Sequence, residues 1–374
     1  MIVKQVDGRT MTKRRAVTSA EIAQEAGVSR ATVSAVLNEA TGNIRISPET
    51  RRRVLAVASK FHYVPNPAAR ALRSNRSGAI AFVSRTMHQT AFGHPVSYQL
   101  NLHSAQAAAR VGAHVIEISP ETTGAVPGEV SGDIFGFLLS RRPDGVIFDA
   151  PTRPDDVAKV LESGIPVVQL LRPHLGVPTA TVTVDATRGV HEAIDHLVGL
   201  GHRAILYLGS ADTHRANRSR LDAFHAALQR HGIVLPESAV ALGPDYTLEG
   251  SIALARAALR REPSPTAIFA GGDIFAVGAL HALHELRVRV PDAISLVSYD
   301  DVYAPLLYPP ITSVAQPLRD VAQRAIDVLM RQIEHTAGET DGDADAPPAH
   351  LVLPTQLHIR SSTQPPRPSG PWTG

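Results

Sequence analysis

Short β-rich runs alternate with amphipathic helical stretches from Gly78 onward, and this alternation restricts the fold more than any other feature. The runs are GAIAFVS, HVIEIS, GVIFDA, PVVQLL, ATVTV, AILYLG, AVALG, AIFAG and ISLVSYD. Such alternation is typical of βαβ units, whose strands form parallel sheets. About nine strands are too many for one ordinary domain of this kind. We therefore predict two similar α/β lobes, with the break near Val184 and Asp185.

The N-terminal part of the chain has a helical pattern instead. Periodicity begins at Thr18, and Gly27 provides a tight turn before a second helix that Ser29 can cap. Ser47 and Pro48 then open a third helix, because proline suits the first helical position. The sequence predicts a small three-helix unit over residues 16–63.

The net charge of +2 is distributed unevenly. Residues 1–78 hold 14 Lys and Arg against 5 Asp and Glu, a net of +9, which leaves 23 against 30, or −7, for the rest. A basic segment on an acidic body is typical of a polyanion-binding head, because each neutralised phosphate releases condensed counterions.

The remaining segments lack periodicity. We expect residues 1–15 to form a flexible basic arm, residues 64–77 a basic connector and residues 364–374 a disordered tail. Cysteine is absent, no run of about 18 uncharged apolar residues occurs, and the N-terminus has no apolar signal region. We expect a cytoplasmic protein without a membrane partner.

The patterns of the common enzyme classes are absent from the sequence. It contains no GxxxxGKS/T, HExxH or GxSxG, and no GxGxxG after a strand, so nothing indicates a phosphate, zinc, hydrolase or dinucleotide site. His191 and His196 share a predicted helix with acidic neighbours, which favours a solvated face over a metal site. We expect no enzymatic activity, no cofactor and no bound metal.

The head resembles the LacI/GalR family of bacterial repressors. The resemblance lies in the pattern AxxAGVSxxTVSxVLN, which ends at Asn38, and in SPETRRRVLAVASKFHYVPNPAARALRSNRS after it. Turn, caps, third helix and connector follow in the family's order. The resemblance implies a helix-turn-helix domain over residues 16–63, with its second helix in the major groove of DNA. It also implies a hinge helix over residues 64–77.

Arg30 is the best candidate for reading a base, because a guanidinium can donate two hydrogen bonds to guanine; a phosphate contact or plain solvation is the alternative. Ala35 stands where many members carry Arg, and a three-residue expansion around residues 41–46 departs from the usual spacing. Residues 51–53 and Lys60 suit phosphate contacts or a solvated face equally. The DNA contacts that the resemblance implies are Thr18, Ser29, Arg30, Ala31, Thr32, Ser34, Ala35, Asn38, Tyr63, Asn66, Ala69 and Leu72.

Leu72 occupies the position from which two hinge leucines wedge into the central base step through the minor groove in that family. Its basic neighbours Arg70, Arg73 and Arg76 argue against a buried core position. Unstacking a base step costs a few kcal/mol, which bent DNA can offset by contacting more protein.

The resemblance continues to about Thr363 through blocks such as DGVIFDAP, RVPDAISLVSYDD and LPTQLHIRSST. It implies a two-lobed, periplasmic-binding-protein-like sensor with parallel sheets over residues 78–363. The N-lobe is expected to comprise about 78–185 plus 317–335, and the C-lobe about 186–315 plus 350–363. The chain is then expected to cross between lobes near Asp185, near residues 314–316 and after about Glu334.

Ligands of such folds lie between the lobes, at the carboxyl ends of the strands. Arg220 and Asp300 match ligand contacts of the family, and together they suit vicinal hydroxyl groups, since the guanidinium donates and the carboxylate accepts. A surface position for Arg220 and a turn cap for Asp300 are the structural alternatives. Gly272 stands where many members have a ligand-binding Asn, and Asp273 suits the N-cap of the next helix. Phe92 and His94 are weaker ligand candidates.

The resemblance implies a homodimeric repressor of carbohydrate-related genes that binds a pseudo-palindromic double-stranded operator and is released by a sugar or sugar derivative. The alternatives are an activator, or a corepressor-dependent regulator whose ligand is a nucleobase or nucleoside. A solute-binding protein shares the two-lobed body, but the helical head and the lack of a signal region argue against that class. In its bound state the regulator is expected at the bacterial nucleoid.

Overall fold

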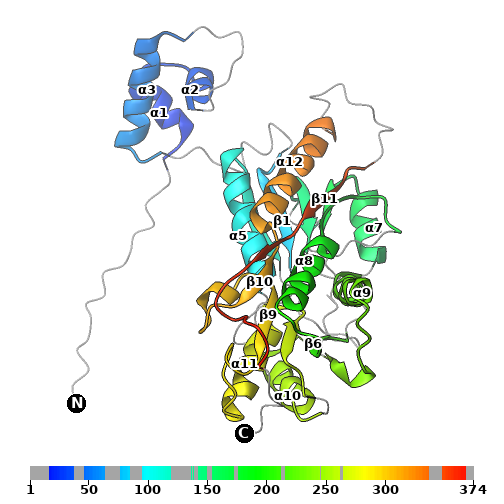
Figure 1. Cartoon of the computed structure of the whole chain (residues 1–374). Helices are drawn as coiled ribbons and strands as arrows, with labels where there is room; N and C mark the ends of the chain where they lie inside the picture. The colour runs from blue at the N-terminus through cyan, green and yellow to red at the C-terminus, as the bar shows by residue number, and fades with distance from the viewer. Residues whose placement is uncertain are drawn as a thin grey trace, which may run out of the picture. The chain divides into compact units, whose positions relative to one another are not determined.

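The computed structural model describes residues 17–37, 46–63, 76–84, 95–118, 136, 138, 142–149, 154–171, 176–211, 215–244, 246–261, 264–336 and 348–367. The chain divides into two compact units, Met1–Ser77 and Gly78–Gly374 (Figure 1). Each is described by itself. Among the described residues, no helix has the length and apolar character needed to cross a membrane.

The head contains the helices α1 (Ser19–Ala26), α2 (Arg30–Leu37) and α3 (Pro48–Lys60). Thr18 and Glu21 form a reciprocal capping box at the start of α1. Gly27 ends that helix in the left-handed region, with φ of 63°, where a Cβ is unfavourable. Ser29 Oγ accepts a hydrogen bond from Thr32 N at 3.1 Å, which caps α2. The predicted helices and their turn are therefore present.

The apolar faces of these helices form one small core. Its buried members are Ile22, Ala23, Ala26, Val33, Val36 and Val54. Most of them come from α1 and α2, so those two helices are fixed against each other by burial as well as by the Gly27 turn.

The first sheet of the larger unit is entirely parallel. In spatial order its strands are β11 (His350–Pro354), β5 (Ala180–Asp185), β4 (Val167–Leu170), β3 (Gly145–Phe148), β1 (Ala79–Val83) and β2 (His114–Ile118). One face packs against α5 (Pro95–Arg110) and α12 (Leu318–Thr336), which lie side by side in Figure 1. The other face packs against α7 (Pro154–Glu162). Strand residues alternate between the two faces, as the pleat requires.

The second sheet is parallel except for its edge strand β12. Its strands in spatial order are β12 (Gln356–His358), β10 (Thr312–Ala315), β9 (Ser295–Asp300), β8 (Ala267–Ala270), β6 (Ile205–Ser210) and β7 (Val240–Gly243). The helices α8 (Ala186–Gly199) and α9 (Arg215–Arg230) cover one face. The helices α10 (Leu248–Ala258) and α11 (Asp273–Glu285) cover the other. Two short 3₁₀ turns complete the lobe, Glu237–Ala239 and Ala304–Leu306.

Three segments connect the two lobes: Asp185, the last residue of β5 and the N-cap of α8, Gln316 between β10 and α12, and Thr355 between β11 and β12. The first and third are tied together, because Thr355 Oγ1 donates to the carbonyl of Asp185 at 2.7 Å. The same oxygen accepts from Gly189 N at 3.1 Å. A methyl group at Gly189 would overlap Thr355 and Val314, so glycine is required at this close approach.

The assignment of residues 350–363 to the C-lobe is wrong for their first part. β11 pairs with β5 in the first sheet, and the third crossing therefore lies at Thr355 rather than soon after Glu334. The physical reason is that β5 would otherwise be an edge strand with unpaired backbone groups, which β11 satisfies.

The expected disordered tail also starts too early. Gln364 N donates to Ser295 Oγ at 3.1 Å, and the carbonyl of Gln364 lies 2.9 Å from His202 Nε2. The solvated face expected for His196 is wrong, because this ring is half-buried and its Nε2 lies 2.9 Å from Thr363 Oγ1, which helps to hold the C-terminal segment. Nothing in the polar composition of this segment indicates these contacts, because their partners are distant in sequence.

Candidate functional site

The exposed end of α2 is the candidate DNA-binding face. Ser29, Arg30 and Ala31 are exposed, and Thr32 and Ser34 are half-buried. The N-terminal side chains of α2 are therefore accessible to a partner, with a five-donor guanidinium at Arg30. Thr18 is also exposed, but its hydroxyl is engaged with Glu21 in the capping box.

Two predicted DNA contacts lie in a different environment. Ala35 is only 7% exposed, which argues against its predicted contact, because alanine has no side chain beyond the covered Cβ. Tyr63 is half-buried and packs against the head core, and its N–H bonds the carbonyl of Ala58 at 2.9 Å. Lys60 pairs with Glu25 at 2.9 Å on the surface. Four other predicted DNA contacts lie outside the described residues: Asn38, Asn66, Ala69 and Leu72. The predicted ligand contacts Phe92 and His94 lie outside them as well.

The second candidate site lies at the carboxyl edge of the second sheet. Asp300 is the last residue of β9, and Gln316 follows β10 on the neighbouring strand. Gly271 and Gly272 follow β8, and Tyr246 lies between β7 and α10. Parallel strands bring these four connections to one edge, which is where ligands bind in open α/β sheets.

Arg220 of α9 reaches this edge and is 5% exposed. One guanidinium nitrogen donates to the carbonyl of Gly271 at 2.6 Å, and the other lies 3.3 Å from Asp300 Oδ1. The guanidinium also stacks on the Tyr299 ring, with 3.9 Å between Cζ and the ring centroid. Burial from water lowers the pKa of Arg220, but the Asp300 carboxylate and the rings of Tyr299, Tyr246 and Tyr207 together outweigh burial and raise that pKa overall. The predicted pair is therefore brought together, and Arg220 does not occupy the surface position that was its alternative.

Asp300 receives two further hydrogen bonds. Gln316 Nε2 donates to its Oδ1 at 2.7 Å, and the Tyr246 hydroxyl donates to its Oδ2 at 2.9 Å. Asp300 is 2% exposed, so these partners replace water around a buried carboxylate.

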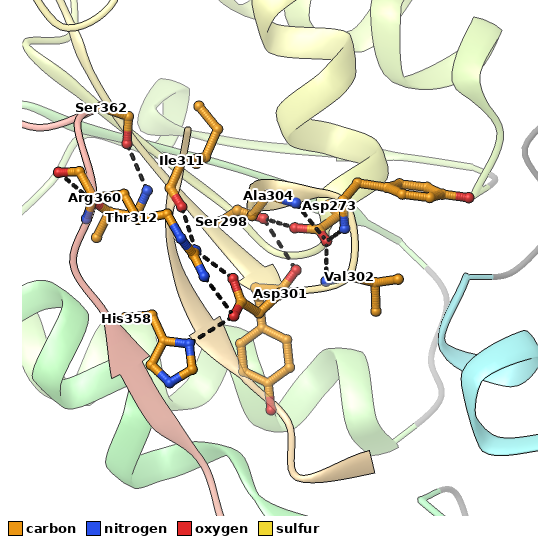
Figure 2. Close-up of polar contacts among 12 residues, drawn as sticks. Asp273, Ser298, Asp301, Val302, Ala304, Ile311, Thr312, His358, Arg360 and Ser362 are labelled. Atoms are coloured by element: carbon orange, nitrogen blue, oxygen red, sulfur yellow. Dashed lines mark hydrogen bonds and ion pairs between the residues drawn. The ribbon is translucent and has the colours of Figure 1, made fainter. Parts of the chain in front are cut away.

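Asp273 is fully buried and organises the turn after β9. Its carboxylate accepts hydrogen bonds from the Ser298 hydroxyl and from three consecutive backbone N–H groups, those of Val302 at 2.7 Å, Tyr303 at 2.6 Å and Ala304 at 3.3 Å. Figure 2 shows these contacts. Burial and the charge of Asp300 raise the pKa of Asp273 to about 7, while the hydrogen bonds act in the opposite direction. Gly272 is the N-cap of α11, so the capping role expected for Asp273 is wrong.

Asp301 holds the other side of the same turn. Its carboxylate makes a two-bond pair with Arg360, at 2.5 and 3.0 Å, and lies 2.8 Å from His358 Nδ1 (Figure 2). Asp300 and Asp301 have φ of 100° and 61°, which is uncommon for residues other than glycine. The contacts of Asp273 and Arg360 hold this backbone, and hence the direction of the Asp300 side chain.

An open pocket of about 390 Å³ lies beside Asp300. It is lined by both lobes, including Gln99 and His103 of α5, Gln316 at the second crossing and Arg319 of α12. Asp300 therefore faces a space that changes shape if the lobes move.

Tyr246 and Gln316 were not predicted as site residues. The rule that ligand residues follow parallel strands could have indicated Gln316, which comes directly after β10. Tyr246 follows β7 by a longer connection, and only its hydrogen bond to Asp300 identifies it.

Two family models match the chain. Residues 18–66 match the bacterial regulatory proteins of the lacI family, and residues 194–363 match a periplasmic binding protein-like domain. The first match covers α1 to α3, and the second covers the second sheet and the residues around Asp300.

Similar proteins cover nearly the whole chain. The HTH-type transcriptional regulator CelR of Thermobifida fusca is 33% identical over 357 residues, which is 94% of this chain and all of CelR. The structure of a transcriptional regulator CelR–cellobiose complex has a TM-score of 0.65 at 30% identity, and covers 92% of this chain and 99% of that one. A Lac repressor dimer bound to operator and the anti-inducer ONPF has a TM-score of 0.74 at 26% identity, over 94% of this chain and all of that one.

Proposed function

Because this chain belongs to the LacI family of HTH-type transcriptional regulators, we propose that it is a homodimeric repressor whose operator binding is relieved by a sugar-like effector at Arg220 and Asp300. It acts in the cytoplasm, and the role requires no catalytic step. The observation that carries the proposal is the buried pair of Arg220 and Asp300 at the carboxyl edge of a parallel sheet.

The chemistry of this pair suits a polyhydroxylated ligand. A guanidinium donates to hydroxyl oxygens, and a carboxylate accepts from hydroxyl hydrogens, so the two bind vicinal hydroxyl groups in complementary ways. Tyr246 adds an aromatic ring beside Asp300. The cellobiose in the complex of a similar regulator is consistent with this ligand class.

The head supports operator recognition. Arg30 is exposed at the start of α2, where the second helix of a helix-turn-helix meets base edges. The similar Lac repressor structure is a dimer on its operator. Two copies of the head then bind two half-sites, which is why the operator is expected to be nearly palindromic.

The crossings supply a route from ligand to DNA. Gln316 lies on the second crossing and bonds Asp300 directly, and Thr355 fixes the third crossing to the first through Asp185. An effector that prefers one lobe arrangement shifts the equilibrium towards it by its differential affinity. The resulting change at the first lobe alters the separation of the two heads in the dimer.

The experiment that tests this function is the selection of bound fragments from a random DNA pool by the full-length protein, with the salt concentration held constant. A palindromic motif supports the repressor model. Arg30→Ala is expected to relax the preference at one base of each half-site by about 1–3 kcal/mol. Arg53→Ala, which removes another exposed head charge, is the matched control and is expected to leave the motif unchanged. Binding without any motif contradicts the proposal.

A further inference from the structure

Tyr246 makes the contact to Asp300 that a hydroxylated ligand would make. Its hydroxyl donates to Asp300 Oδ2 at 2.9 Å. Its ring packs edge-on against Phe275, with 5.1 Å between centroids and 85° between planes. Burial and the Asp300 charge raise the pKa of Tyr246 well above its usual value, so the phenol keeps its proton and stays a donor.

The lack of a side chain at Gly272 leaves the space that the Tyr246 phenol occupies. A methyl group built on Gly272 would overlap the Tyr246 hydroxyl oxygen, and would lie 2.9 Å from Tyr246 Cζ and 3.1 Å from Asp300 Oδ2. The φ of Gly272 is 178°, an extended conformation open to any residue, so the absence of a side chain here reflects space rather than backbone. A side chain at position 272 and the observed position of Tyr246 exclude each other.

The acceptor sites of Asp300 are largely occupied by the chain's own donors. A carboxylate offers about four lone-pair sites. Among the described residues, Gln316 and Arg220 reach Oδ1, and Tyr246 reaches Oδ2. A ligand hydroxyl must share Oδ2 with the phenol or replace it.

We propose that Tyr246 is an internal competitor for the effector at Asp300, and that Gly272 is the residue that makes this competition possible. The inference rests on the proposed function, because it assumes that effector hydroxyls bind Asp300. Its consequence is selectivity. A ligand with a single hydroxyl at this end only exchanges one hydrogen bond for another, whereas a vicinal pair gains Arg220 as well.

The first test compares wild type with Tyr246→Phe by isothermal titration against cellobiose and a panel of mono- and disaccharides. Phenylalanine keeps the ring and its Phe275 contact but leaves Asp300 Oδ2 open to the ligand. The association constant of the tightest sugar is expected to rise about threefold or more. The reason is that the substitution removes the hydrogen bond from Tyr246 to the Asp300 carboxylate, which the ligand would otherwise have to displace. Tyr308→Phe, at an exposed tyrosine, is the matched control and is expected to bind like wild type.

An unchanged or lowered association constant in Tyr246→Phe overturns the competition, because it means that the phenol does not oppose the ligand. Failure of every panel sugar to bind either protein rejects the proposed sugar effector. In that case the second test still decides whether Tyr246 occupies the space beside Gly272.

The second test needs no ligand. Gly272→Ala is made in wild type and in Tyr246→Ala, and the melting temperatures of the four proteins are compared. Gly272→Ala is expected to lower the melting temperature in wild type, and by less than half as much where the phenol is absent. Gly199→Ala, where a methyl group meets nothing within 4 Å, controls for the general effect of the substitution. Equal losses in both backgrounds overturn the exclusion.

Discussion

Replacing Arg220 with methionine is expected to destabilise the second lobe strongly. Methionine keeps an apolar stem of similar length but removes the charge that faces Asp300 at 3.3 Å. Breaking a buried ion pair from one side costs about 3–5 kcal/mol. The two neutral donors that remain on Asp300, from Tyr246 and Gln316, place the expected loss near the lower end, at about 3 kcal/mol.

The assay is urea unfolding of the full chain followed by circular dichroism. Arg220→Met combined with Asp300→Asn removes both charges and is expected to regain at least half of the loss. Arg256→Met is the matched control, since it breaks an ion pair of 2.7 Å that water screens at the surface, and its midpoint is expected to stay near that of wild type. A loss below about 1 kcal/mol for Arg220→Met, or a double variant that is less stable than Arg220→Met, refutes the reasoning.

Three further predictions follow from the same contacts. Thr18→Ala removes the half of the capping box that the Thr18 hydroxyl makes with the Glu21 N–H, and is expected to cost about 1 kcal/mol of head stability, measured by thermal circular dichroism. Asp273→Asn is expected to lower the melting temperature, because a neutral amide oxygen accepts the three backbone N–H groups that converge on Asp273 Oδ2 less strongly than a carboxylate oxygen does. An unchanged melting temperature would show that the charge of Asp273 is not needed to hold the turn after β9. Burial lowers the pKa of His202 below 6.5, partly opposed by the carbonyl of Gln364. The unfolded chain therefore binds the proton first, and stability is expected to fall as pH drops below about 6.5 and to level off below the folded-state pKa. The urea midpoint of His202→Gln is expected to change less than that of wild type between pH 7.5 and pH 5. An equal change in both proteins would contradict the assignment of this pH dependence to His202.

The sequence was sufficient to predict most of the fold. All nine predicted runs form strands, because each is a short run rich in apolar residues. The three missed strands are β10, β11 and β12, which lie at or next to a sheet edge and have at most five residues. Which sheet β11 joins depends on the unpaired edge of β5, a partner about 170 residues away that periodicity does not reveal.

The candidate ligand site was only partly predictable. Arg220 and Asp300 follow from family resemblance, and the structure brings them together. The mutual exclusion of the Tyr246 phenol and a side chain at position 272 depends on three connections that meet only in the folded sheet. In the head, the caps and the turn follow from local rules, whereas the covered position of Ala35 depends on tertiary packing.

The central claim is that a ligand at Asp300 controls operator binding by the head. It is tested most directly by fluorescence anisotropy of the selected operator at fixed salt, with and without a saturating concentration of the sugar that binds most tightly. Wild type is expected to lose at least tenfold in operator affinity when the sugar is present. Asp300→Asn is expected to bind the operator with the same affinity whether or not the sugar is present. An operator affinity that no panel sugar changes, or an Asp300→Asn protein that responds as wild type does, would contradict the account.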